Sequence, residues 1–192
     1  MQYNRIQVDI QMREYGDNDC PHPEINIIID DKNIIDIIGE HESIKGYSPA
    51  GGYFGLRADH IDPNFYQGKS EAEFGASENK TPILDCSCGS IGCWTLVANI
   101  HINDESVVWD DFENVHRNSE SISPEWDYSS IKFHFNRKEY MEQFSVLTAA
   151  TNSNNKLFGN PTSKHLPHPR KNANAKIESS WLRMHINKLF NK

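Results

Sequence analysis

The chain of 192 residues lacks several features that would narrow its function at once. No apolar run is long enough to cross a bilayer, and the first residues lack the charged-then-apolar pattern of an export signal. No nucleophile elbow, His-Glu-x-x-His motif or paired-carboxylate motif is present, and the glycine-rich residues 51–55 are not followed by the Lys-Ser/Thr of a phosphate-binding loop. We therefore expect a cytoplasmic protein that binds no membrane and has a non-enzymatic role.

Cysteine is also scarce, but three of the four cysteines fall within residues 86–93. Cys86, Cys88 and Cys93 flank a short turn whose glycines supply the positive φ angles that tight turns require. Three interpretations stay open: buried reduced thiols, a zinc site, or a Cys88–Cys93 disulfide, which a reducing cytoplasm disfavours. The candidates for a fourth zinc ligand are Cys20, His22 and His101. The cofactor prediction is accordingly either none or zinc.

The same stretch predicts a β-hairpin. With a four-residue turn, Leu84 would lie opposite Val97, and directly paired residues share a face of the sheet. The three cysteines would then occupy one face, and the face that carries Trp94 and the alternate residues as far as Ile102 would be the core. A slip of one residue in the register would break this assignment.

Alternating apolar residues elsewhere predict further strands. The predicted strands are Ile6–Met12, Ile25–Ile29, Val107–Phe112 and Ile131–Phe135. Residues 34–38 fit either a return strand or a short helix, and their β-branched isoleucines favour the strand. Asn136 can cap a helix after the last strand, with Glu139 reaching back to the cap. These patterns predict an α+β fold with a mainly antiparallel sheet, a helix after the last strand and a C-terminal helix.

Charge is unevenly distributed along the chain. Residues 151–192 hold eight Lys or Arg and one acid, whereas residues 1–150 hold 11 bases and 26 acids, a net charge of −15. Such an acidic body repels nucleic acid and anionic lipid and attracts basic proteins. We expect a single domain at 1–150, a linker at 151–172, and a basic C-terminal helix at 173–192 through which the chain could form oligomers.

The acidic body predicts a protein-binding module, similar to bacterial immunity proteins that neutralise basic toxins by charge-matched binding. The carboxylates predicted to contact a basic partner are Asp104, Glu105, Asp110, Asp111 and Glu113. The alternatives are a zinc-stabilised scaffold and a thiol-dependent enzyme. A nucleophilic thiol needs a lowered pKa, and Asp85, the charge nearest to the cysteines in sequence, acts in the opposite direction.

Five segments together carry a resemblance to a group of proteins. They are PHPEINIIIDDKN at residues 21–33, GGYFGL at 51–56, CSCGSIGCW at 86–94, VVW at 107–109, and the stretch from WDY at 126–128 to FHF at 133–135. In this order they resemble a group of small bacterial proteins of uncharacterised function that share a Cys-x-Cys-Gly-x-x-Gly-Cys segment. The resemblance covers roughly residues 5–145. It implies a single α+β domain in a bacterial cytoplasm and transfers no activity.

Overall fold

Two antiparallel sheets form the framework of the protein. The computed structural model describes residues 2–14, 21–58, 63–67, 80–89, 92–117, 125–145 and 147. The first sheet has the strand order β1-β2-β3 and the second has the order β4-β5-β6-β7-β8. The predicted α+β class and the helix after the last strand are confirmed. The predicted linker at 151–172 and helix at 173–192 lie outside the described residues.

Most of the described elements are strands, and three helices lie among or after them. The strands are β1 (Ile6–Arg13), β2 (His22–Ile29), β3 (Lys32–Asn33), β4 (Tyr53–Gly55), β5 (Thr81–Cys86), β6 (Leu96–Ile102), β7 (Ser106–Asn114) and β8 (Phe133–Asn136). The helices are α1 (Ile34–Ile44), the 3-10 helix η1 (Pro63–Gln67) and a helix over residues 137–145. None of the helices in this part of the chain has the length and apolar composition that crossing a membrane requires.

Strand β1 follows the apolar alternation of the sequence in its first half. β1 pairs along its whole length with β2, and Ile6 and Val8 are buried, whereas Met12 at the other end is 65% exposed. β2 includes Pro23 as its second residue. Proline lacks an amide hydrogen, so it is tolerated near a strand end, and its carbonyl accepts a hydrogen bond from the Ala58 amide at 2.8 Å.

Residues 34–38 begin helix α1, so the strand that their composition favoured is wrong and the helical alternative holds. The side chain of Asn33 caps the helix by accepting a hydrogen bond from the Ile35 amide at 2.8 Å. Ile34 and Ile38, one turn apart, are both buried. Burial of one helix face outweighs the modest preference of isoleucine for strands.

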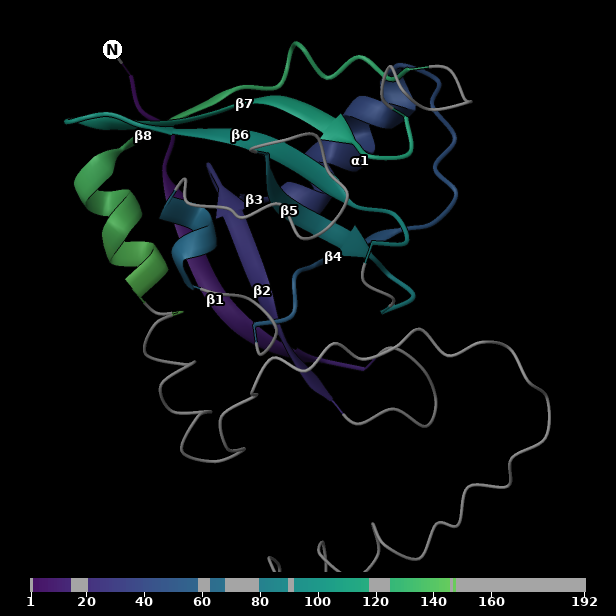
Figure 1. The fold of residues 1–192 in the computed structure, drawn as a ribbon, viewed down its shortest axis with the longest axis horizontal. Coiled ribbons are helices and arrows are strands. Elements are labelled where there is room, and N and C mark those ends of the chain that lie inside the picture. The colour runs from purple at the N-terminus through teal and green to yellow at the C-terminus, as the bar shows by residue number, and fades with distance from the viewer. Residues whose placement is uncertain are drawn as a thin grey trace, which may run out of the picture. The chain divides into compact units, whose positions relative to one another are not determined.

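The helix that follows β8 begins as its capping pattern predicts. Oδ1 of Asn136 accepts hydrogen bonds from the amides of Lys138 at 3.0 Å and Glu139 at 3.2 Å. Tyr140 and Phe144, on one face, are buried in the core. Figure 1 shows this helix (green) beside β8, with α1 toward the opposite end of the five-stranded sheet.

The pairing of β5 with β6 differs by one residue from the prediction. Leu84 lies opposite Leu96 instead of Val97, and an irregularity between Pro82 and Leu84 shifts the register by one further residue, so that Pro82 lies opposite Val97. The connection between the two strands therefore covers residues 87–95, which is longer than the four-residue turn expected from the glycines.

The pairing of Leu84 with Leu96 places Cys86 on the same face of the sheet as Leu96, and this face packs on the core. Directly paired residues share a face, and the pairs are Tyr53–Cys86, Leu84–Leu96 and Leu96–Asn114. All five residues are buried, and we term their side of the sheet the inner face. The prediction that the cysteines lie opposite the core is therefore wrong for Cys86.

Candidate metal centre

The three clustered cysteines come together at the end of β5. The Sγ atoms of Cys86, Cys88 and Cys93 all lie within 4.8 Å of one another. All three are free thiols; Cys86 is buried, whereas Cys88 and Cys93 are exposed. They are the residues that the sequence predicted as metal ligands. Among the described residues, no other group of three or more ligating side chains comes this close together.

Backbone hydrogen bonds and glycines shape the loop that carries the cysteines. The Cys88 amide donates to Sγ of Cys86 at 3.4 Å, and the Gly89 amide donates to the carbonyl of Cys86 at 3.0 Å. Gly89 and Gly92 both have a φ of 76°, a conformation that glycine adopts without steric cost. The two glycines therefore let the chain turn back so that Cys93 meets the other two thiols.

Asp85 ties the two halves of this loop together. Its carboxylate accepts hydrogen bonds from the Cys86 amide at 2.8 Å, from Oγ1 of Thr95 at 2.9 Å and from the Gly92 amide at 3.3 Å. Burial raises the pKa of Asp85, and these hydrogen bonds oppose the rise. The sequence identified Asp85 only as a negative charge near the thiols, since its bond to Gly92 depends on the folded loop.

The backbone at Gly51 and Gly52 lies against the cysteine loop. The Gly52 carbonyl accepts a hydrogen bond from the Ser87 amide at 2.9 Å. A Cβ on Gly51 would lie 3.4 Å from Sγ of Cys86, and a Cβ on Gly52 would lie 3.1 Å from Oγ of Ser87. The sequence showed only that the glycine-rich residues 51–55 are not a phosphate-binding loop. Instead, the small residues let this backbone approach the buried sulfur before it enters β4.

The pKa of Cys86 argues against a role as a catalytic nucleophile. Burial, together with hydrogen bonding to the neighbouring thiols, raises the pKa of Cys86 to about 12. An activated nucleophilic cysteine has the opposite shift, toward a lower pKa. A bound metal cation would offset the effect of burial, because coordination stabilises the thiolate directly.

Neither of the described candidates for a fourth ligand joins the three sulfurs. Nε2 of His101 lies 3.1 Å from Oδ1 of Asp110, where the two side chains interact. His22 is the first residue of β2, in the other sheet. The third candidate, Cys20, lies outside the described residues.

An aromatic cluster that sequence reasoning missed borders the loop on the side of Cys93. Nε2 of His116 lies 3.1 Å from the Gly92 carbonyl, and its ring stacks on Trp94 with 5.8 Å between centroids. The guanidinium of Arg117 lies over the rings of both Trp94 and Trp126. The position of Trp94 directly after Cys93 was the only sequence signal for this cluster.

The five carboxylates predicted to contact a basic partner separate into two groups. In the first group, Asp110, Asp111 and Glu113 all lie on β7 and pair with lysines. Lys132 lies 2.9 Å from Asp110, and Lys80 lies 3.0 Å from Asp111 and 2.7 Å from Glu113. These ion pairs neutralise much of the charge that the sequence assigned to a partner.

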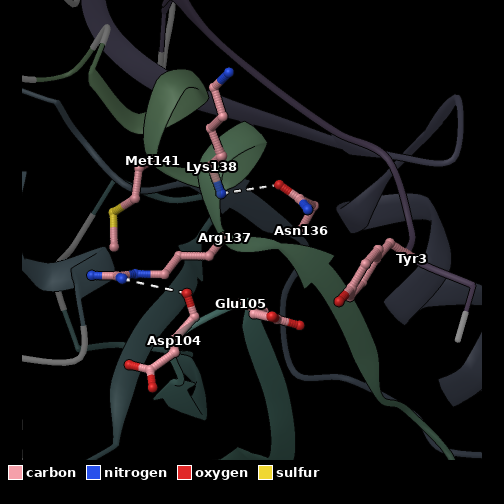
Figure 2. A pocket seen from close by; sticks show the side chains of 7 residues that line it. All are labelled: Tyr3, Asp104, Glu105, Asn136, Arg137, Lys138 and Met141. Atoms are coloured by element: carbon pink, nitrogen blue, oxygen red, sulfur yellow. Dashed lines mark hydrogen bonds between the residues drawn. The ribbon is translucent and has the colours of Figure 1, made fainter.

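The second group, Asp104 and Glu105, lies between β6 and β7. Both residues line a pocket with Arg137 and Lys138 (Figure 2). The Arg137 amide donates to the Glu105 carbonyl at 3.0 Å, and its guanidinium donates to the Asp104 carbonyl at 3.5 Å. Figure 2 shows Lys138 extending away from both acidic side chains. Because the hydrogen bonds from Arg137 use backbone oxygens, the two carboxylates stay available for other contacts.

Comparison with known proteins adds nothing to this geometry. No protein-family model matches the chain, and neither the curated proteins nor the solved structures yield a match. The resemblance to small bacterial proteins and the cytoplasmic location stay predictions.

Proposed function

We propose that the chain binds one zinc ion through Cys86, Cys88 and Cys93 and that this ion stabilises the loop they share. The supporting observation is the convergence of the three Sγ atoms within 4.8 Å. Thiolates bonded to zinc at about 2.3 Å in a tetrahedron lie about 3.8 Å apart. The sulfurs therefore need to move only slightly to bind the ion.

The donor atoms select the type of metal. Thiolates are soft ligands that favour zinc over calcium or magnesium. The amide of Cys88, which donates to Sγ of Cys86, would stabilise the negative sulfur in the manner of outer-shell hydrogen bonds at metal sites. With three thiolates the centre would carry a single negative charge, and a fourth ligand would complete the tetrahedron.

The ion would contribute to stability by holding the connection between β5 and β6. This connection covers residues 87–95 and is longer than a tight hairpin turn. A metal that binds only the folded arrangement adds its binding free energy to that of folding. The proposed role is therefore structural, and any activity of the protein would lie elsewhere on its surface.

Metal content tests this proposal. Protein purified without a chelator should contain about one zinc per chain by elemental analysis, and Cys86→Ser should contain none. Ser87→Ala is the matched control, because Ser87 lies between two ligands and contacts Gly52 through its backbone amide. A folded wild-type protein that contains no metal, and shows no thiolate absorption with cobalt(II), would contradict the zinc site.

A second candidate function is the binding of a basic protein by an immunity-like module. It is supported by the net charge of −15 over residues 1–150 and by the pocket that Asp104 and Glu105 line. Complementary charge accelerates association and suppresses wrong partners. Since Asp110 and its neighbours are already paired with lysines, the proposal now depends on Asp104 and Glu105.

A pull-down with a basic toxin domain encoded by the neighbouring reading frame tests this second function. Wild-type protein and the Asp110→Asn control should capture the domain, whereas a variant with Asp104→Asn and Glu105→Gln should release it at lower salt. Failure of the wild-type protein to capture the domain would reject the basic partner. The zinc site would be unaffected by that result.

A further inference from the structure

A second polar cluster lies on the inner face, joined to the cysteines through Tyr53. Glu42, in the last turn of α1, is 2% exposed. Tyr53 and Tyr128 both donate hydrogen bonds to its Oε1, at 2.9 and 2.6 Å. Nδ2 of Asn114 donates in turn to the hydroxyl of Tyr53 at 2.8 Å. Two tyrosines therefore hold the carboxylate in one orientation, and Asn114 holds one of them in place.

Both tyrosines use the same oxygen, so the other carboxylate oxygen is left over. Oε2 of Glu42 accepts no hydrogen bond from the described residues, and no lysine or arginine among them pairs with this carboxylate. Burial raises the pKa of Glu42, and the hydrogen bonds from the two tyrosines oppose the rise. A cation at Oε2 would therefore remove an electrostatic cost that the folded protein already carries.

Glu42 lines a cavity of about 500 Å³ between α1 and the segment before β4. The charged members of its lining are Lys32, Asp36, Glu40 and Glu42. Lys32 pairs with Glu40, which leaves two carboxylates without a compensating base in the lining. Such an excess of negative charge concentrates cations.

We propose that this cavity binds a small organic cation whose primary ammonium group donates a hydrogen bond to Oε2 of Glu42. An ammonium group offers three directed donors, and Ile35 and Pro49 of the lining present apolar surface to an alkyl chain. A bare divalent cation fits less well, because among the described residues only the three cysteines form a group of metal ligands. The site is independent of the zinc proposal.

Titration with n-butylammonium chloride tests the site, and n-butanol is the neutral control of the same shape. Amide NMR spectra of wild-type protein should show saturable changes at Gly51 and Gly52 with the ammonium and none with the alcohol. Glu42→Gln should weaken binding about tenfold or more, since glutamine keeps one oxygen for the tyrosines and presents an amide donor to the cavity. Glu139→Gln, which removes an exposed carboxylate outside this lining, should retain binding.

Two results would overturn the proposal. One is equal spectral change with n-butanol and n-butylammonium on wild-type protein, a comparison that needs no variant to fold. The other is unchanged affinity in Glu42→Gln. Nα-acetyl-lysine methylamide distinguishes the sources of the ammonium group: tighter binding than n-butylammonium assigns the site to lysine side chains of proteins, and weaker binding assigns it to free amines.

Discussion

The cysteine loop and the Glu42 cluster adjoin each other on the inner face, because Cys86 of the loop pairs directly with Tyr53 of the cluster. In the Glu42 cluster, hydroxyl, amide and carboxylate groups bond to one another at 2.6 to 2.9 Å. In the cysteine loop, one amide reaches one sulfur at 3.4 Å. Oxygen and nitrogen groups can satisfy each other inside a protein, whereas thiols are weak donors and acceptors. The hydrogen bonds of the Glu42 cluster thus order it without a ligand, whereas the cysteine loop would gain order from a metal.

Removal of the metal should produce the largest difference between the two regions, because it should loosen the cysteine loop and leave the Glu42 cluster unchanged. A chelator should lower the melting temperature of wild-type protein by about 10 °C, which corresponds to the loss of about 4 kcal/mol of metal linkage in a chain of this size. Thermal unfolding with and without chelator measures this, and Cys86→Ser should show no difference. Hydrogen exchange should increase at Gly89 and Gly92 and stay slow in the Glu42 cluster. An unchanged melting temperature would show that the loop needs no ion.

Truncation of Glu42 should have the next largest effect. Glu42→Ala leaves the hydroxyls of Tyr53 and Tyr128 without their acceptor, which we expect to cost about 3 kcal/mol of unfolding free energy. Denaturant unfolding measures the loss. Glu40→Ala, which removes an exposed ion pair with Lys32, should cost about 0.5 kcal/mol or less. Zinc content should be unchanged in both variants, and a loss of zinc in Glu42→Ala would show that the two regions fold as one.

Asp85 should affect only the cysteine loop. Asp85→Asn removes one acceptor from the group that holds the Cys86 and Gly92 amides together, so zinc affinity should fall about tenfold, at the lower end for outer-shell groups of metal sites. Competition with a chromophoric chelator measures the affinity. The cobalt(II) spectrum should keep its thiolate bands, since every sulfur stays in place. Affinity equal to that of the wild type would mean that the glycines alone order the loop.

The smallest expected effect is a pH dependence of the free energy of unfolding that arises from the titration of Glu42. Burial raises the pKa of Glu42 above its ordinary value of 4.5, so the folded protein binds this proton more tightly than the unfolded chain. Its stabilising contribution is therefore complete below pH 4.5 and is lost as the pH rises through the folded pKa. Unfolding of Glu42→Gln measured across this range should show a shallower fall. Asp85 shifts in the same direction, so some slope should persist.

Local patterns in the sequence were sufficient to predict much of the fold. The alternation in β1 and the cap at Asn136 depend on residues within one strand or one turn, and both are confirmed. The three cysteines could be singled out because they are close in sequence. For α1, by contrast, the β-branched isoleucines misled the prediction, since the choice was made by burial against the sheets.

The rest of the two clusters depends on contacts between distant residues. Glu42 and Tyr128 are 86 positions apart, so no spacing pattern joins them. The pairing of Leu84 with Leu96 places Cys86 on the inner face, and a register difference of one residue cannot be seen in an alternating pattern of apolar residues. The approach of Gly51 to the sulfur was equally hidden, because small residues are also typical of flexible loops.

The unequal burial of the three thiols has a kinetic consequence. Cys88 and Cys93 are exposed, whereas Cys86 lies beneath the backbone of Gly51. A reagent such as iodoacetamide attacks thiolates that it can reach, so it should modify the two outer thiols of the metal-free protein first. Alkylation of Cys86 must wait until the segment at Gly51 moves away. The rate at which Cys86 is alkylated therefore measures how often the segment at Gly51 moves away from the sheet.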